Sequence, residues 1–379
     1  MGAEPEGRIL CVVGARPNFI KIAPVVMALR ARPGLAVRLV HTGQHYDDAM
    51  SAVFFEELGI PAPDVGLGIG PGSHAAQIAA VMRGVEPVID AWAPSLLLIV
   101  GDVNSTLAAA LVAVTRGLPI AHVEAGLRSF DRTMPEEINR VLTDQISELL
   151  FTTERGAEAN LRREGIAPER VHFVGNVMID SLRAGLARAV PADAILAGAD
   201  EAAAARARRE GFALATLHRP ANVDDPAALA RLLGALTRIA ERLPVVFPVH
   251  PRTAGRIAAA GLEPALARAD VLRLPPLGYL RMLGLMRAAR LVLTDSGGIQ
   301  EETTGLGVPC LTLRPNTERP ITVEQGTNTV VGTDPEAIVR AADEILRTGG
   351  KRGRIPELWD GRAAERIAER IVAWLAARP

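Results

Sequence analysis

The chain has 379 residues, with 42 Lys and Arg against 43 Asp and Glu, so its formal net charge is −1. This balance excludes a chain-wide field that favours nucleic acid or anionic membranes. The aromatic content of 3% also argues against a base-stacking surface. We therefore expect no nucleic-acid or membrane partner, in a chain long enough for two domains with large cores.

The two cysteines, Cys11 and Cys310, both lie in apolar, strand-like runs. This placement predicts buried free thiols, with no disulfide scaffold and no metal cluster. The N-terminus lacks the charged-then-apolar pattern of a signal peptide, and no uninterrupted apolar run approaches membrane-spanning length. We therefore expect a soluble, cytoplasmic protein.

Short apolar runs alternate with helix-length segments along most of the chain. The predicted strands are 8–13, 36–40, 95–100, 119–122, 149–152 and 171–174, then 212–216, 244–248, 271–274, 291–293 and 310–313. The predicted helices between them include 20–30, 74–92, 107–115 and 136–147. Such alternation is typical of parallel sheets covered by helices on both faces, the α/β class.

The alternation forms two series that divide near Gly175 and Asn176, which predicts two doubly wound domains, 1–175 and 176–362. Segment 184–209 is rich in Ala and Arg without strand signals, and we expect it to form surface helix. The last helical segment, about 363–377, has no strand after it. The pattern alone allows it to pack on either domain.

Ligands of doubly wound sheets bind outside the carboxyl ends of the strands. Nearly every predicted strand end is followed by ionisable or hydrogen-bonding residues, in the runs 14–21, 41–47, 101–106, 122–128 and 135–140, and then 218–222 and 250–253. We expect one cleft between the two domains to collect these groups. Their convergence is what favours a functional site.

Residues 291–332 contain the strongest candidate for an anion site. A predicted strand, 291–293, is followed by a glycine turn, 294–298, and by a helix from Ile299. The unpaired N–H groups and positive dipole end of such a helix attract a phosphate, and glycines let it approach the main chain. Glu301 and Glu302, one turn inside the helix, could reach sugar hydroxyls, and Arg319 could add positive charge to a diphosphate.

Each candidate also has a purely structural explanation. Asp102 and Ser105 could cap the next helix, and Glu136 and Glu137 could simply complement a helix dipole. His218 and His250 could be polar residues whose hydrogen bonds are satisfied within the fold. Lys21 could be a solvated helix residue, and Arg128 and Arg140 could pair with nearby acids.

Taken together, these residues resemble the non-hydrolysing UDP-N-acetylglucosamine 2-epimerases over almost the whole chain. The matching motifs are Gly14-Ala15-Arg16-Pro17 with Lys21, Thr42-Gly43-Gln44-His45, Gly101-Asp102, His122-Val123-Glu124-Ala125-Gly126-Leu127-Arg128, Pro135-Glu136-Glu137-Ile138-Asn139-Arg140, His218-Arg219, Pro248-Val249-His250, Ser296-Gly297-Gly298-Ile299-Gln300-Glu301-Glu302 and Glu318-Arg319-Pro320. The resemblance implies the glycosyltransferase-B architecture, two Rossmann-like domains facing across a cleft. It also implies that helix 363–379 packs back on the first domain.

The resemblance implies an isomerase that interconverts UDP-N-acetylglucosamine and UDP-N-acetylmannosamine. The C2 proton is not adjacent to a carbonyl, so the family expels UDP from C1 to give 2-acetamidoglucal, and then adds UDP back with a proton on the opposite face of C2. By resemblance the catalytic residues are Asp102, Glu124, Glu136 and His218. The implied substrate- and UDP-binding residues are Arg16, Lys21, His218, His250, Ser296, Gly297, Gly298, Glu302 and Arg319. The resemblance implies no metal and no cofactor, a homodimer, and a role in cell-surface polysaccharide biosynthesis.

Three departures from the family pattern bear on substrate and regulation. Ala221 stands where many relatives have a carboxylate beside the histidine, Asp47 replaces a second glutamine, and the loop 70–74 lacks an arginine used for a regulatory sugar nucleotide. We therefore expect no activation by substrate. The same loops also resemble relatives that act on UDP-2,3-diacetamido sugars, which keeps that substrate as an alternative.

Other classes of protein also remain open from the sequence. A hydrolysing epimerase would release UDP and free sugar, and a glycosyltransferase of the same architecture would need an acceptor. A non-catalytic sensor of nucleotide sugars would keep the UDP site without Asp102, Glu124 and Glu136.

Overall fold

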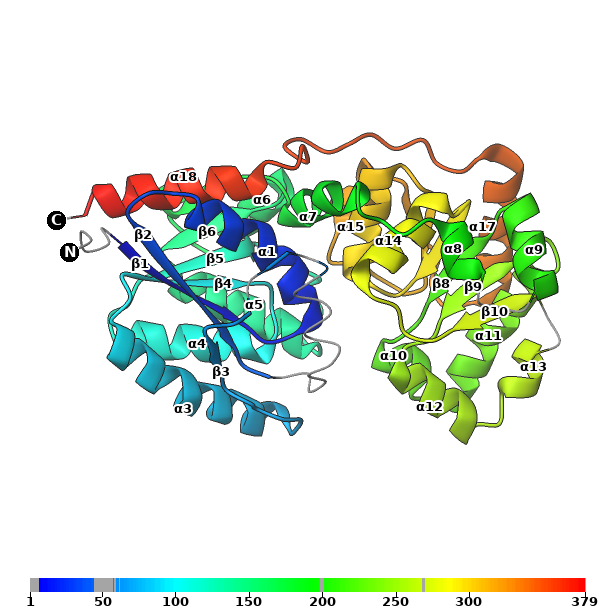
Figure 1. Cartoon of the computed structure of the whole chain (residues 1–379), viewed down its shortest axis with the longest axis horizontal. Coiled ribbons are helices and arrows are strands. Elements are labelled where there is room, and N and C mark those ends of the chain that lie inside the picture. The colour runs from blue at the N-terminus through cyan, green and yellow to red at the C-terminus, as the bar shows by residue number, and fades with distance from the viewer. Residues whose placement is uncertain are drawn as a thin grey trace. The chain divides into compact units, whose positions relative to one another are not determined.

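The computed structural model describes residues 7–43, 57, 59–60, 62–197, 201–267 and 270–378. The chain forms two compact units, Met1–Arg183 with Glu357–Pro379, and Ala184–Pro356. Each unit is built on one sheet in which every strand pair is parallel. Figure 1 shows the helices that flank each sheet.

The first sheet has the strand order β3-β2-β1-β4-β5-β6-β7. Its strands are β1 (Gly7–Val13), β2 (Leu35–His41), β3 (Val65–Gly66), β4 (Leu96–Val100), β5 (Ile120–Ala125), β6 (Leu149–Thr152) and β7 (Val171–Phe173). The helical segments of this part are α1 (Arg16–Arg30), α3 (His74–Trp92), α4 (Asn104–Thr115), α5 (Pro135–Ile146), α6 (Arg155–Arg163), the short 3-10 helix η1 (Pro168–Arg170), α7 (Val177–Leu186) and α18 (Ala363–Ala376).

The central strand β4 shows why an unbroken apolar run forms this strand. Side chains alternate between the two faces of a strand, and here both faces are buried. Leu96 and Leu98 join the core beneath α1 and α18, whereas Leu97 and Ile99 join the core beneath α3 and α4. In Figure 1 helix α18, drawn in red, lies beside α1, and the two helices pack together.

The second sheet has the strand order β10-β9-β8-β11-β12-β13. Its strands are β8 (Ala213–Thr216), β9 (Val245–Pro248), β10 (Val271–Leu274), β11 (Leu291–Thr294), β12 (Cys310–Thr312) and β13 (Asn328–Val330). Its helices are α8 (Ala192–Leu196), α9 (Glu201–Glu210), α10 (Pro220–Val223), α11 (Pro226–Ala240), α12 (Pro251–Ala259), α13 (Glu263–Ala267), α14 (Tyr279–Ala288), α15 (Gly297–Leu306), α16 (Pro320–Glu324) and α17 (Pro335–Thr348). The core of this unit lies between the sheet, α11 and α17.

The predicted α/β class with two doubly wound domains is confirmed. The division falls between Arg183 and Ala184, so α7 belongs to the first unit apart from its last turn, whereas the predicted division preceded this helix. The region predicted as surface helix contains α8 and α9, and Ala204 and Ala207 of α9 are buried rather than exposed.

Both cysteines are buried free thiols, as expected, and burial raises the pKa of each thiol to about 12. Within the described ranges, no helix is long and apolar enough to cross a membrane.

Candidate functional site

Lys21 of α1 and Glu124 of β5 form a buried ion pair at the carboxyl end of the first sheet. The pair lies against the backbone of Gly101, which has a φ of +67°. A Cβ at Gly101 would lie 3.4 Å from Lys21 Nζ and 3.7 Å from Glu124 Oε2. A larger residue would therefore strain the turn, and its Cβ would lie only 3.1 Å from Asn18 Nδ2. Lys21 is thus not the solvated helix residue of the structural explanation.

Glu124 itself has a strained backbone. Its φ is +73°, in the left-handed region that non-glycine residues rarely occupy. The strain coincides with a register shift between β5 and β6, at Val123 and Ala125. A bulge of this kind re-aims one side chain of a strand. Such outliers persist where the surroundings over-determine them, and they cluster at functional sites.

Asp102 lies directly after Gly101 and pairs with Arg140 of α5. The same guanidinium contacts Glu137, with Nη1 2.5 Å from Oε2, and Glu137 accepts backbone N–H bonds from Ser129 and Phe130, both at 2.9 Å. Glu137 therefore holds the loop before α5, a structural role.

The helix-cap explanation for Asp102 and Ser105 fails. Val103 is the N-cap residue of α4, without a side-chain cap bond. Ser105 instead forms a 2.8 Å hydrogen bond with Thr42, below Gly14.

Glu136 is half-buried in the first turn of α5. Within the described part of the chain, no hydrogen bond or ion pair engages its carboxylate. Arg16 begins α1, but its side chain lies outside the described residues, as do residues 44–47.

In the second unit, β11 leads into α15 through Asp295 and Ser296. Ser296 is the N-cap residue of α15 and makes no side-chain cap bond, so its hydroxyl does not satisfy the first amides of the helix. A Cβ at Gly297 would lie 2.8 Å from Glu318 Oε1, so only glycine lets this carboxylate approach the helix start. A built-in carboxylate therefore lies where a helix N-terminus attracts anions.

Glu318 is buried among arginines. Arg314 Nη2 lies 2.9 Å from its Oε2 and Arg219 Nη2 lies 3.4 Å from its Oε1. Burial alone would raise the pKa of Glu318, but the charges of Arg319, Arg314 and Arg219 hold that pKa well below its usual range. Sequence reasoning named Arg319 and missed Arg314, although Arg314 closely follows a strand in the same way as the residues that it did name.

The other two glutamates of this site point into the unit. Arg319 Nε lies 3.0 Å from Glu301 Oε1, and both side chains are buried. Glu302 is also buried and interacts with Tyr279 of α14. Burial and the charge of Glu301 raise the pKa of Glu302 to about 8, against the opposing effect of the Tyr279 hydrogen bond. Tyr279 was not predictable from the sequence, because only the fold brings it to Glu302.

His218 follows β8 and faces Asp295, with Nδ1 2.9 Å from Oδ1. Burial alone would raise the pKa of Asp295, but hydrogen bonds from the His218 ring and from the backbone N–H groups of His218 and Arg219 keep it below its ordinary value. The sequence lacks a carboxylate beside His218, at Ala221, and Asp295 supplies one from the next strand of the sheet.

His250 lies beside His218, with the ring centroids 5.6 Å apart. Its Nδ1 accepts the backbone N–H of Arg252 at 3.2 Å and so caps α12. The structural explanation for His250 therefore holds for one ring nitrogen.

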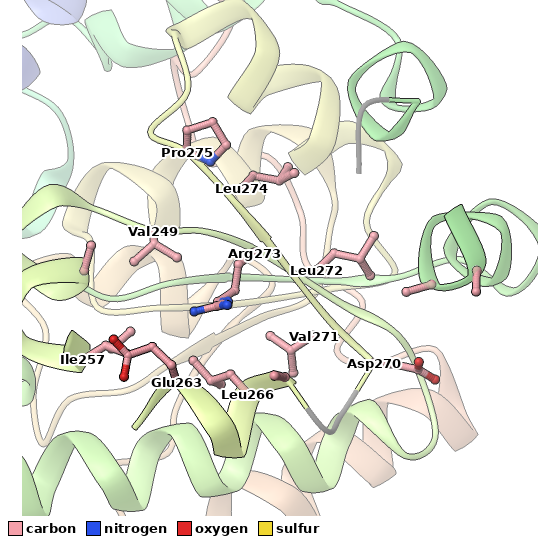
Figure 2. Close-up of a pocket in the computed structure, with 14 residues that line it drawn as sticks. Val249, Ile257, Glu263, Leu266, Asp270, Val271, Leu272, Arg273, Leu274 and Pro275 are labelled. Carbon is pink, nitrogen blue, oxygen red and sulfur yellow. The ribbon is translucent and has the colours of Figure 1, made fainter. Parts of the chain in front are cut away.

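A cavity of about 790 Å³ lies along the edge strand β10, and Figure 2 shows its lining. Apolar side chains such as Leu266, Leu272 and Leu274 line it, with Glu263 and Arg273 among them. None of the predicted site residues lines this cavity. Over the described ranges, no group of three or more His, Cys, Asp or Glu residues has the arrangement of a metal site.

Two parallel sheets with polar residues at the ends of their strands are the arrangement of the glycosyltransferase-B type of architecture. A sequence model of the UDP-N-acetylglucosamine 2-epimerase family matches residues 27–372. The chain therefore belongs to the UDP-N-acetylglucosamine 2-epimerase family.

The chain is also similar in sequence to characterised epimerases and in structure to a solved one. The UDP-N-acetylglucosamine 2-epimerase of Methanococcus maripaludis is 40% identical over 90% of this chain and 92% of its own length. The UDP-2,3-diacetamido-2,3-dideoxy-D-glucuronate 2-epimerase of Pseudomonas aeruginosa is 43% identical over 96% of this chain and 98% of its own length. The crystal structure of Methanocaldococcus jannaschii UDP-GlcNAc 2-epimerase in complex with UDP-GlcNAc and UDP matches with a TM-score of 0.85 and 40% identity, over 97% of this chain and 99% of that one.

Proposed function

We propose that this chain interconverts UDP-N-acetylglucosamine and UDP-N-acetylmannosamine. UDP leaves C1 while a base removes the C2 proton, and UDP then adds back to 2-acetamidoglucal with a proton on the opposite face of C2. The observation that carries the proposal is the cluster at Gly101, where Asp102 and the Lys21–Glu124 pair lie at the same turn. The chain that carries this cluster belongs to the epimerase family.

The three proposed catalytic carboxylates differ in their neighbouring charges, as we expect where two proton transfers take place on opposite faces of C2. Glu124 lies beside Lys21 and Asp102 beside Arg140, so a cation holds each of these carboxylates in place. Glu136 has no such cation within the described part of the chain, which suits a carboxyl group that exchanges protons with substrate. His218, oriented by Asp295, is a second candidate for proton transfer.

We assign UDP binding to the start of α15 and the arginines around it. Ser296, Gly297 and Gly298 offer the helix N-terminus to the diphosphate, and Arg319 offers positive charge. Glu302 is the proposed ribose partner, as a carboxyl group that burial favours in its neutral form. Arg16, Lys21 and His250 complete the proposed substrate-binding set.

A UDP-2,3-diacetamido sugar is the second candidate substrate. The observation in its favour is the identity of 43% to the Pseudomonas aeruginosa enzyme, against 40% to the Methanococcus maripaludis enzyme. Two values this close do not separate the substrates, so the sugar is to be measured.

Proton NMR of each nucleotide sugar with the enzyme in deuterium oxide tests the proposal. An epimerase alone, without acceptor, gives the C2 epimer with deuterium at C2. Release of UDP and free sugar instead of epimer would show a hydrolase, and no reaction until an acceptor is added would show a transferase. Turnover of the 2,3-diacetamido sugar alone would assign the second substrate.

Variants of the carboxylates test the residue roles. Asp102→Asn, Glu124→Gln and Glu136→Gln should each lower turnover by about 10²–10⁴, and UDP affinity should survive because these side chains act on the sugar. Near-normal turnover in all three variants would refute the assignment. Glu169→Gln, in the exposed 3-10 helix η1, is a control that should leave both properties unchanged.

We further propose that the enzyme works as a cytoplasmic homodimer and supplies a precursor of cell-surface polysaccharide. The family membership supports this proposal. Analytical ultracentrifugation of the full chain should give twice the chain mass of 40.2 kDa, and a monomer at micromolar concentration would refute the dimer.

A further inference from the structure

A buried charged network lies behind the two turns that carry Asp102 and Glu124. His122 of β5 and Asp144 of α5 are both fully buried, with His122 Nδ1 2.7 Å from Asp144 Oδ1. The other ring nitrogen, Nε2, lies 2.8 Å from the carbonyl oxygen of Gly101. His122 therefore contacts the peptide that leads directly into Asp102.

Asp144 reaches the other turn. Its Oδ2 accepts the backbone N–H of Gly126 at 3.0 Å, two residues after Glu124. The same oxygen accepts a 2.7 Å hydrogen bond from Arg128 Nη2. Burial alone would raise the pKa of Asp144, but the hydrogen bonds and charges of His122 and Arg128 hold that pKa below its ordinary value, so the carboxylate is anionic.

The hydrogen bonds fix the orientation of the His122 ring. A carbonyl oxygen only accepts, so Nε2 donates to Gly101. Nδ1 lies against the Asp144 carboxylate, which also accepts from Arg128, and Arg128 in turn pairs with Glu164 at 2.6 Å.

We propose that the His122–Asp144 pair is a positioning element of the epimerisation reaction, which fixes the Asp102 turn and the Glu124 turn relative to each other. Asp144 lies on α5, the helix that also begins with Glu136. One buried pair therefore ties together the three structural elements that carry the proposed catalytic carboxylates. A reaction with two proton transfers at one carbon is sensitive to such an arrangement, because a misplacement of about 1 Å can cost roughly 10² in rate.

Two substitutions at His122 separate its two hydrogen bonds. His122→Asn places an amide N–H near the Nδ1 position and keeps the bond to Asp144, while it loses the bond to Gly101. His122→Gln places the N–H near the Nε2 position and does the reverse. Because either change breaks the chain of hydrogen bonds between the two turns, we expect turnover to fall about 10² in both variants. KM and UDP affinity should stay within about threefold, because the proposed UDP site lies in the other unit.

His172 offers a matched control in the same sheet. It lies on β7 and is half-buried, and its Nε2 has no hydrogen-bond partner among the residues that the structure describes. His172→Asn makes the same chemical change without touching either turn, and its turnover should stay within about twofold of the wild type. Circular dichroism and thermal unfolding are recorded for all variants.

The outcomes distinguish this inference from the proposed function on which it rests. Wild-type enzyme without epimerase activity would refute the function, whereas active wild type with His122→Asn within threefold of it would refute the positioning role. Losses of turnover in both His122 variants that UDP affinity follows in parallel would show a general structural defect and also overturn it.

Discussion

Replacing Asp295 by Asn tests how the second unit prepares His218. The carboxylate of Asp295 is fully buried. It accepts hydrogen bonds from His218 Nδ1 at 2.9 Å, from the backbone N–H of Arg219 at 2.9 Å and from the side-chain amide of Asn222 at 3.1 Å. An asparagine has a single acceptor oxygen, so its NH₂ group would face an N–H donor whichever way it turned.

The expected loss of stability follows from that arrangement. Losing a charge-assisted hydrogen bond costs about 1.5–3 kcal/mol, and leaving a buried donor unsatisfied costs about 1–3 kcal/mol. We therefore expect the free energy of unfolding to fall by about 3–5 kcal/mol in urea titrations. Turnover should fall by about 10²–10⁴, because the imidazole loses the carboxylate that orients it.

Asp225→Asn is the matched control for this prediction. Asp225 is an exposed aspartate in the same unit that caps α11, accepting the backbone N–H groups of Ala227 and Ala228 at 3.1 and 3.2 Å. Asparagine is an equally good cap, so stability should change by less than about 0.5 kcal/mol and turnover should not change. Asp295→Asn with turnover within threefold of the wild type would refute the role assigned to the His218–Asp295 pair.

Three further predictions concern the anion site, acid–base behaviour and regulation. Gly297→Ala should weaken UDP binding about tenfold in calorimetry, a cost of about 1.4 kcal/mol, because its Cβ would lie 2.8 Å from Glu318 Oε1. The control is Gly234→Ala, whose Cβ would lie in open space, and this variant should bind UDP normally. Asp180 accepts backbone N–H groups at the start of α18, and burial raises its pKa to about 6. The protonated form is therefore favoured in the folded state. The contribution of this residue to stability is full below its unfolded pKa of about 4 and is lost as the pH rises through 6. Urea midpoints of Asp180→Asn should therefore fall less than those of the wild type between pH 4 and pH 7, and parallel curves would contradict this. Initial rates starting from the manno epimer alone should be hyperbolic without added gluco epimer, and a silent reverse reaction would reveal an effector site.

The fold was predictable from the sequence wherever a strand is buried on both faces. The run 96–100 is apolar at every position because each face of β4 meets helices, and such runs stand out in the sequence. The strands that the prediction missed, β3 (Val65–Gly66) and β13 (Asn328–Val330), are short edge strands. Neither leaves an apolar run in the sequence, because β3 has only Val65 and Gly66 and β13 begins with Asn328 and Thr329.

The site was predictable only as far as position after a strand reveals it. Lys21, Asp102 and Glu124 were found in this way. Which residues pair with one another was not predictable, since Arg140 meets Asp102 from a helix 38 positions further along the chain. Asp295 was visible as a turn residue, but its pairing with His218, 77 positions earlier, depends on the adjacency of β8 and β11.

Both units use the same device, with different consequences. In each unit, a buried aspartate lies against a histidine Nδ1 and accepts a hydrogen bond from a backbone N–H that follows a strand. These pairs are Asp144 with His122 in the first unit and Asp295 with His218 in the second. The difference is exposure: the His122 side chain is 0% exposed, whereas that of His218 is 38% exposed. Since the second nitrogen of His122 is bound to the backbone, that ring holds the structure. An aspartate-oriented ring that remains exposed is in a position to meet a substrate, so burial, rather than the residue types, is the reason that we assign His218 to the chemistry and His122 to its support.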